Sequence, residues 1–132
     1  MDRTITFAVG PEVKPADAHV RATAFVRRTL PMLLEGTPTA DVVGRDVLAV
    51  VTELVDITAR DRHSTDVFGS VVFDGTHVTV SVGNMHSTLP TPEEEPGLYL
   101  VRGLAEDLGQ YRGDGGGFAT WASVPVVRPD GR

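Results

Sequence analysis

The sequence lacks cysteine, has no long apolar run and has no cluster of lysine or arginine residues. Without cysteine, the protein can have no disulfide framework, no thiolate metal site and no cysteine nucleophile. No apolar stretch approaches the length of a membrane span, and the first residues, MDRTITFAVG, do not have the pattern of a signal peptide. We therefore expect a cytoplasmic protein without a membrane partner.

Positive charge is scarce, and the formal net charge is −6 at pH 7. Because a nucleic-acid backbone is bound through clustered positive charge, we expect no nucleic-acid partner. The sequence also lacks the GxSxG, GxGxxG and Walker patterns, which would indicate a hydrolase nucleophile or a phosphate-binding loop. The histidines do not have the spacing of metal ligands, and we assign no metal site to them.

The clearest element that is present is a helix at Asp41–Arg60. Its apolar residues recur at three- and four-residue spacing and therefore share one face: Val43, Val47, Leu48, Val51, Leu54 and Val55. Thr39 or Asp41 can cap the start of this helix. Glu53 lies late in the helix on a different face, and Ile57 follows one turn later on that face.

The other elements follow from alternation, helical spacing and turn residues. We expect strands at Arg3–Val9, Val67–Phe73, His77–Val82, Gln110–Arg112 and Phe118–Val127, and helices at Pro15 to about Leu30 and at Gly97–Leu108. Pro31 should end or kink the first helix, Gly109 should cap the last one, and Asp74–Thr76 should form a hairpin turn.

The length of 132 residues predicts a single domain that spans residues 1–132. The hairpins among the strands favour an antiparallel or mixed sheet with helices on one face. We therefore predict an α+β fold: a two-layer α/β sandwich with a mixed, mostly antiparallel sheet.

Three residues could belong to a functional site, and each has an ordinary structural alternative. Glu53 could act as a general base, or it could be a solvated surface carboxylate. Asn84, at a strand end, could contact a ligand base or shape a turn. Gly97 begins a helix, and the free N–H groups of a helix start favour an anion, although many helices begin with Pro-Gly.

Three further features add to these candidates. Asp56 and Arg60 are four residues apart on the helix and are expected to pair on its surface. The long loop Asn84–Pro96 contains the acidic run Glu93–Glu95, and a loop of this length is usually functional or mobile. The run Gly115–Gly117 could let the backbone approach a ligand, or it could form a tight turn.

Taken in order, these segments resemble the motifs of one protein family. VTELVDITARDRH resembles the helix motif ELVxNAxxH, and VTVSVGNMHSTLP resembles a strand and loop that hold adenine. PGLYLVRGLAEDLGQY, followed by GGGFATWASV, resembles the last helix and strand of the same family. From about Phe7 to Val126 the chain resembles the bacterial anti-sigma factor/serine protein kinase family, of the histidine-kinase-like ATPase (Bergerat, GHKL) fold.

The resemblance implies a nucleotide pocket, with ATP or ADP and Mg²⁺ as its ligands. The corresponding residues of this chain are Glu53, Ile57, Asn84, Gly97, Leu98 and Thr120. In the family, Glu53 would be the catalytic base, the position of Ile57 would hold Mg²⁺ through an asparagine, and the position of Asn84 would read adenine through an aspartate. A homodimer through the N-terminal strand and the first helix is also implied.

Several residues depart from the family pattern, and the departures weaken nucleotide binding. Ile57 has neither a donor nor an acceptor and cannot hold a hard cation. Asn84 can accept a hydrogen bond from adenine but without charge assistance. The carboxylates of Glu93–Glu95 would repel a triphosphate. Phe118 stands where the family often has lysine or threonine.

These observations lead to three hypotheses. The first, which we favour, is a regulator that binds a sigma factor or an anti-sigma-factor antagonist, with weak or lost ATP binding. The second is an active ATP-dependent serine protein kinase that uses Glu53 with an altered metal arrangement. The third is a binding module for another small ligand, in a pocket lined by Ile57, Asn84 and the helix of Leu98.

Overall fold

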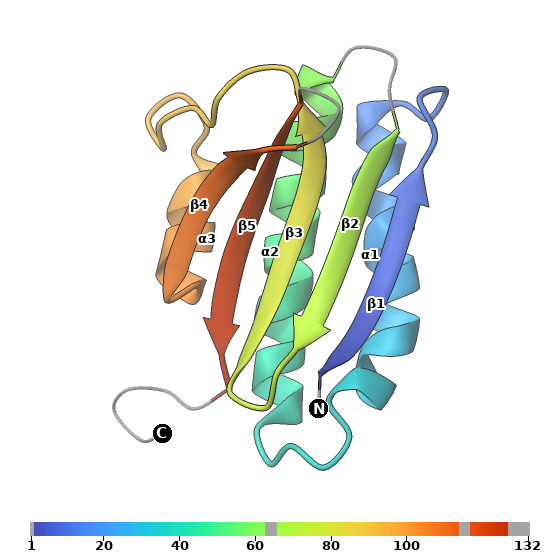
Figure 1. Ribbon diagram of the computed structural model, residues 1–132, viewed down its shortest axis with the longest axis vertical. Coiled ribbons are helices and arrows are strands. Elements are labelled where there is room, and N and C mark those ends of the chain that lie inside the picture. The colour runs from blue at the N-terminus through green and yellow to red at the C-terminus, as the bar shows by residue number, and fades with distance from the viewer. Residues whose placement is uncertain (1, 63–65, 114–116, 127–132) are drawn as a thin grey trace.

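The computed structural model describes residues 2–62, 66–113 and 117–126. In these residues the chain forms a five-stranded sheet with its helices packed behind one face (Figure 1). The elements, in chain order, are β1 (Arg3–Val9), α1 (Pro15–Leu33), α2 (Ala40–Asp61), β2 (Val67–Phe73), β3 (His77–Met85), α3 (Gly97–Leu104), β4 (Asp107–Arg112) and β5 (Phe118–Pro125). No helix in the described part of the chain is both long enough and apolar enough to cross a membrane.

The strands lie in the order β1-β2-β3-β5-β4. The chain leaves β3, forms α3 and reaches the sheet edge at β4, and β5 then fills the position between β3 and β4. The predicted α+β fold, a two-layer α/β sandwich with helices on one face, is confirmed. The predicted mixture of strand directions is not found, because every pairing among the described strands is antiparallel.

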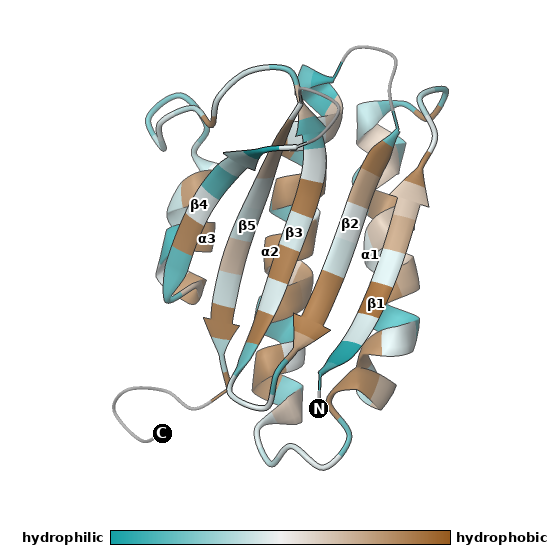
Figure 2. Cartoon of the chain, in the orientation of Figure 1, coloured by the Kyte–Doolittle hydropathy of each residue, from teal (hydrophilic) through white to brown (hydrophobic). Residues whose placement is uncertain are grey.

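The core lies between the sheet and the helices. Along β3, Val78, Val80 and Val82 are fully buried, and the residues between them are partly exposed. The same alternation appears as brown and pale bands along the strands in Figure 2. Helix α2 packs against β2, β3 and β5, and α1 packs beside α2 and over β1. Burial of apolar side chains between these two layers is the main stabilising contribution.

The hairpin between β2 and β3 forms as predicted. Gly75 has a φ of 99°, which glycine adopts without strain. One carboxylate oxygen of Asp74 accepts hydrogen bonds from the backbone N–H groups of Thr76 and His77, both at 2.8 Å. These hydrogen bonds, with one from the Thr76 hydroxyl, lower the pKa of Asp74 to about 2.

Helix α1 does not end at Pro31, one of the two outcomes that the sequence suggested, but continues to Leu33. A proline close to the end of a helix removes only one of its hydrogen bonds. The N–H of Leu34 still donates to the carbonyl oxygen of Leu30, at 3.0 Å. The last turn therefore forms around the proline.

The predicted side-chain cap of α2 is also wrong. Thr39 occupies the N-cap position, but its side chain makes no capping hydrogen bond. Its hydroxyl instead donates to the carbonyl oxygen of Val126, at 2.7 Å. Asp41 lies inside the first turn. Thr39 thus ties the start of α2 to the end of β5, a contact between residues far apart in the sequence.

The helix predicted at Gly97–Leu108 ends at Leu104. Leu108 packs on the core from β4, opposite Ala122 of β5. Leu108 would reach the core from a longer helix as well as from this strand. The helical spacing of the apolar residues therefore could not distinguish a helix from a strand at this position. Gly109 is inside β4 and is not a helix cap.

β3 is longer than predicted and reaches Met85, so Asn84 lies within the strand. The pairing of β3 with β5 changes register between Val82 and Met85. Regular alternation after Val82 would have turned Asn84 toward the helices. The irregularity turns Met85 toward them instead, and Met85 is buried.

Candidate functional site

A pocket of about 430 Å³ lies between the end of α2, the end of β3 and the loop that follows β3. The loop supplies more than half of its lining. The residues that line it are Ile57, Arg60, Asp61, Met85, Ser87, Thr88, Leu89, Pro90, Thr91, Glu94 and Glu95. Of the six residues that the resemblance assigns to a nucleotide pocket, Ile57 alone is among these lining residues.

The inner wall of this pocket is apolar. Ile57, Met85 and Leu98 form a buried cluster of their own, and Leu89 and Phe118 pack against it. Ile57 is only 4% exposed and Leu98 is fully buried. The cluster joins α2, β3 and α3, and it is separate from the main core beneath the sheet. Its side chains offer no oxygen ligand to a cation.

A small polar network lies beside this cluster. The Thr120 hydroxyl donates to the Met85 sulfur at 3.4 Å and accepts from Nε2 of Gln110 at 3.2 Å. The Oε1 atom of Gln110 accepts from the N–H of Leu89, at 2.7 Å. Gln110 thus joins the sheet to the loop that lines the pocket. Sequence reasoning missed Gln110, because its position opposite Thr120 depends on the register of β4 with β5.

Among the residues that line the pocket, Arg60 forms hydrogen bonds with two carboxylates. The guanidinium of Arg60 donates to both carboxylate oxygens of Glu95, at 2.9 and 2.5 Å. Its Nε also donates to Asp56 at 3.1 Å, which confirms the predicted pair of Asp56 and Arg60. Arg60 holds the pKa of Glu95 below its ordinary value, and Glu95, followed by Asp56, raises the pKa of Arg60. Glu95 as a partner of Arg60 was not predicted.

The loop after β3 is fixed by further hydrogen bonds. The N–H of Ser87 donates to a carboxylate oxygen of Asp61 at 2.8 Å, which ties the loop to the end of α2. The N–H groups of Glu94 and Glu95 donate to the carbonyl oxygen of Thr91, at 3.0 and 2.9 Å. The predicted long loop is therefore a folded wall of the pocket.

The charges that line the pocket are mostly negative. Asp61, Glu94 and Glu95 supply carboxylates, and Arg60 is the cation among the lining residues. Arg60 already donates to Glu95 and Asp56. An anionic ligand would therefore meet more carboxylates than unpaired cations. The described residues also contain no cluster of three or more acidic or histidine side chains that could hold a metal ion.

Glu53 lies next to Gly97, at the start of α3. A Cβ atom built on Gly97 would be 2.0 Å from the Oε2 atom of Glu53, so the absence of a side chain permits this approach. A carboxylate is favourable at the N-terminal end of a helix. Within the described residues, Glu53 makes no hydrogen bond or ion pair. The structure thus brings Glu53 and Gly97 together, as the resemblance implied, although Glu53 does not line the pocket itself.

The predicted site residues fall into two places. Ile57, Leu98 and Thr120 all contact or surround Met85, and Glu53 with Gly97 lies at the same end of α3. Asn84 lies elsewhere: it lines a groove on the opposite, open face of the sheet, and its Nδ2 donates to the carbonyl oxygen of Asp66 at 3.5 Å. Of the predicted glycine run, only Gly117 belongs to the described residues, and it lies against Asn84.

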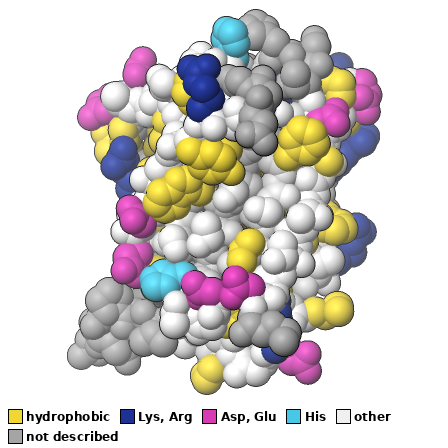
Figure 3. All heavy atoms as spheres, viewed as in Figure 1, with side chains coloured by type: hydrophobic (Ala, Val, Ile, Leu, Met, Phe, Trp, Pro, Cys, Tyr) yellow, Lys and Arg dark blue, Asp and Glu magenta, His cyan; other side chains and the backbone are white. Residues whose placement is uncertain are grey.

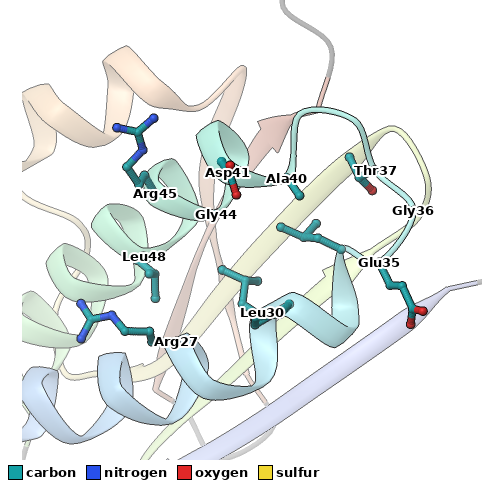
Figure 4. Close-up of a pocket in the computed structure, with 12 residues that line it drawn as sticks. Arg27, Leu30, Glu35, Gly36, Thr37, Ala40, Asp41, Gly44, Arg45 and Leu48 are labelled. Carbon is teal, nitrogen blue, oxygen red and sulfur yellow. The ribbon is translucent and has the colours of Figure 1, made fainter.

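A third groove, of about 370 Å³, lies at the other end of α2 (Figure 4). Leu30, Leu34 and Leu48 form its apolar wall, where Gly44 leaves room between α1 and α2. In Figure 4, Arg27 and Arg45 lie at one end of the groove and Glu35 at the other. None of the predicted site residues lies there, and no motif in the sequence indicated this groove.

No protein family among those compared matches this sequence, and no curated protein is significantly similar to it.

Proposed function

We propose that this chain is a regulatory protein of the anti-sigma factor/serine kinase type that acts by binding a protein partner, with weak or lost nucleotide binding. The observation that carries the proposal is the position of Ile57. It is buried against Met85 and Leu98, where the family that the motifs resemble would hold a metal ion. An apolar wall cannot replace the water or oxygen ligands of Mg²⁺.

The charge of the pocket supports the same proposal. Phosphoryl transfer depends on cations that neutralise the phosphates. In this pocket the Arg60 guanidinium is paired with Glu95 and Asp56, and Glu94 and Asp61 add further negative charge. By analogy with the resembled family, the partner would be a sigma factor or an anti-sigma-factor antagonist, in the cytoplasm. A homodimer is part of the same analogy.

A second candidate function is an active ATP-dependent serine protein kinase. It is favoured by Glu53, whose carboxylate lies beside Gly97 without a hydrogen-bond partner among the described residues. Such a carboxylate has the reach to accept a proton or to position a water molecule. This candidate requires ATP with Mg²⁺ to bind despite Ile57.

Titration calorimetry with ATP and Mg²⁺ tests the proposal. The wild-type protein should give no binding signal at millimolar nucleotide, and the Ile57→Asn variant should gain affinity for the Mg²⁺ complex because it restores an oxygen ligand. Val42→Asn is the matched control, since Val42 is on the same helix and 44% exposed. Low-micromolar ATP affinity of the wild type would contradict the proposal. Transfer of labelled phosphate to a candidate antagonist, lost in Glu53→Gln, would establish the kinase instead.

A further inference from the structure

The face of the sheet that the helices do not cover is almost free of charge. The side chains on this open face alternate with the buried ones, and its central positions are Thr4, Thr6, Ala8, Phe68, Ser70, Val72, Thr79, Ser81, Gly109, Tyr111, Ala119, Trp121 and Ser123. Charged residues make up 23% of the whole sequence, but none of these positions is charged. The one carboxylate at a paired position of this face is Asp107, opposite Ser123 at the start of the edge strand β4. Figure 3 shows mostly white and yellow atoms across the middle of this face, with acidic and histidine side chains below them and along the edges.

Aromatic side chains stand out from this face. Phe68 on β2 is 52% exposed and Tyr111 on β4 is 55% exposed. Between them lies a groove of about 250 Å³, and small residues such as Gly83 and Ala119 form its floor. The rings of Phe68 and Tyr111 therefore form the two sides of the groove, which runs across β3 and β5 between them.

Trp121 extends the apolar surface beside this groove. A Cβ atom built on Gly109 would lie 2.7 Å from the indole ring, so the ring lies directly over the glycine of the neighbouring strand. The indole therefore lies flat on the sheet, and Trp121 remains partly exposed to solvent. Trp121 is the single tryptophan of the chain.

We propose that the open face of the sheet is the contact surface between two copies of this chain, with an aromatic ring from each copy entering the groove between Phe68 and Tyr111 of the other. Interfaces are depleted of charge at their centre and enriched in aromatic residues, as this face is. In a twofold dimer the same surface must supply both the projecting groups and the cavity. Here the rings and the groove lie on one face.

The charge of the chain restricts the face by which a second copy can dock. Each copy carries a net charge of −6, so two copies repel wherever their charged surfaces meet. The open face is the broad surface on which this repulsion is weakest, because its charges lie at the margins. Two sheets pack face to face at about 10 Å, which lets uncharged side chains of this size interdigitate.

The size of the face is adequate for a dimer. Five strands at about 4.8 Å spacing and about six residues in length give roughly 24 Å by 20 Å, before the relief of the side chains is counted. This plan area of roughly 480 Å² is about three fifths of the roughly 800 Å² that each partner contributes to a standard interface, and the relief of the side chains adds to it. The proposal does not depend on the proposed regulatory function, and it differs from a dimer through β1 and α1.

Sedimentation velocity across a concentration series tests this surface. The wild-type chain should sediment as a dimer, and Ser81→Arg should raise the dimer dissociation constant at least tenfold. Ser81 lies opposite Ser70 and Trp121 at the centre of the face. Because arginine lowers the net negative charge, loss of the dimer could not be attributed to greater overall repulsion.

The matched control is Val20→Arg, since Val20 is 57% exposed on α1 and lies on the alternative dimer surface. It should leave the dissociation constant unchanged. A wild-type chain that remains monomeric at the highest concentration would overturn the proposal. So would a dimer that Val20→Arg separates and Ser81→Arg does not. Circular dichroism checks that both variants are folded.

Trp121 gives a second readout that needs no variant. Its emission should shift to shorter wavelength, and acrylamide should quench it less, as the concentration rises through the dissociation constant, because the partner covers the indole. A dimer whose Trp121 emission and quenching match those of the monomer would place the contact elsewhere and overturn the proposal.

Discussion

The two faces of the sheet are built from the same strands but follow different chemical rules. The covered face is mainly apolar and rich in valine, with Val71, Val78, Val80 and Val124 fully buried. The open face is made of serine, threonine, glycine and a few aromatic residues. The covered face stabilises the fold because its apolar side chains are buried. The open face is not needed for this packing, so its side chains can form a binding surface.

Neighbouring positions on β3 should show this difference most strongly. Val80→Asn should lower the free energy of unfolding by roughly 3 kcal/mol, because it removes apolar burial and places an amide without partners in the core. Ser81→Asn should change it by less than about 0.5 kcal/mol. Urea denaturation at low protein concentration measures both values. Equal effects would mean that the two faces are not distinguished by burial.

Two glycines sharpen the comparison, because each lies under an aromatic ring on a different face. A Cβ atom built on Gly69 would be 1.9 Å from the ring of Phe7, which packs on the core, so Gly69→Ala should cost about 1–3 kcal/mol. Gly109→Ala displaces Trp121 on the open face, where the ring can move away. It should cost less than about 1 kcal/mol and change the Trp121 emission.

Thermal unfolding followed by circular dichroism compares these two glycine variants. A larger loss of stability for Gly109→Ala than for Gly69→Ala would contradict the prediction that side chains on the covered face are packed more tightly than those on the open face. It would also mean that Trp121 is fixed by contacts other than those between the two strands.

The smallest effect on stability is expected for the ion pair of Arg60 and Glu95, near the buried cluster of Ile57, Met85 and Leu98. The side chains are 43% and 24% exposed, so Arg60→Gln should cost about 0.5 kcal/mol. Since Arg60 lowers the pKa of Glu95, the pair contributes in full above the ordinary value of 4.5 and is lost as the pH falls through the lowered pKa.

Hydrogen exchange of the loop after β3 measures this effect. Arg60→Gln should speed the exchange at pH 7, and the difference from wild type should disappear in strongly acidic solution. Arg102→Gln is the control, because Arg102 is exposed on α3 and its removal should not affect the loop. A difference that grows as the pH falls would mean that Arg60 does not stabilise the ionised form of Glu95.

Much of the fold could be predicted from local patterns. The alternation in Arg3–Val9 and Val67–Phe73 and the turn at Asp74–Thr76 gave these elements with their observed bounds. The end of α3 could not be predicted, because Leu108 fits the core from a helix or from a strand. The motif segments placed Glu53, Ile57, Gly97 and Leu98 near one another, as the structure does.

The position of Asn84 could not be derived from its segment. The register shift after Val82 turns Met85 to the helices and leaves Asn84 on the open side. Arg60 was predicted to pair with Asp56 alone, because the approach of Glu95 depends on the path of the intervening loop. Likewise, Gln110 reaches the pocket only through the pairing of β4 with β5.

The sequence by itself determined which residues are apolar and at what period, and hence the two layers and the identity of the central helix. It also determined that an isoleucine follows Glu53 by one turn. Only the tertiary structure decided what these residues do together, because contacts across strands and loops depend on register. It buried Ile57 in an apolar wall, joined Arg60 to Glu95 beside the pocket, and left a sheet face of low charge open.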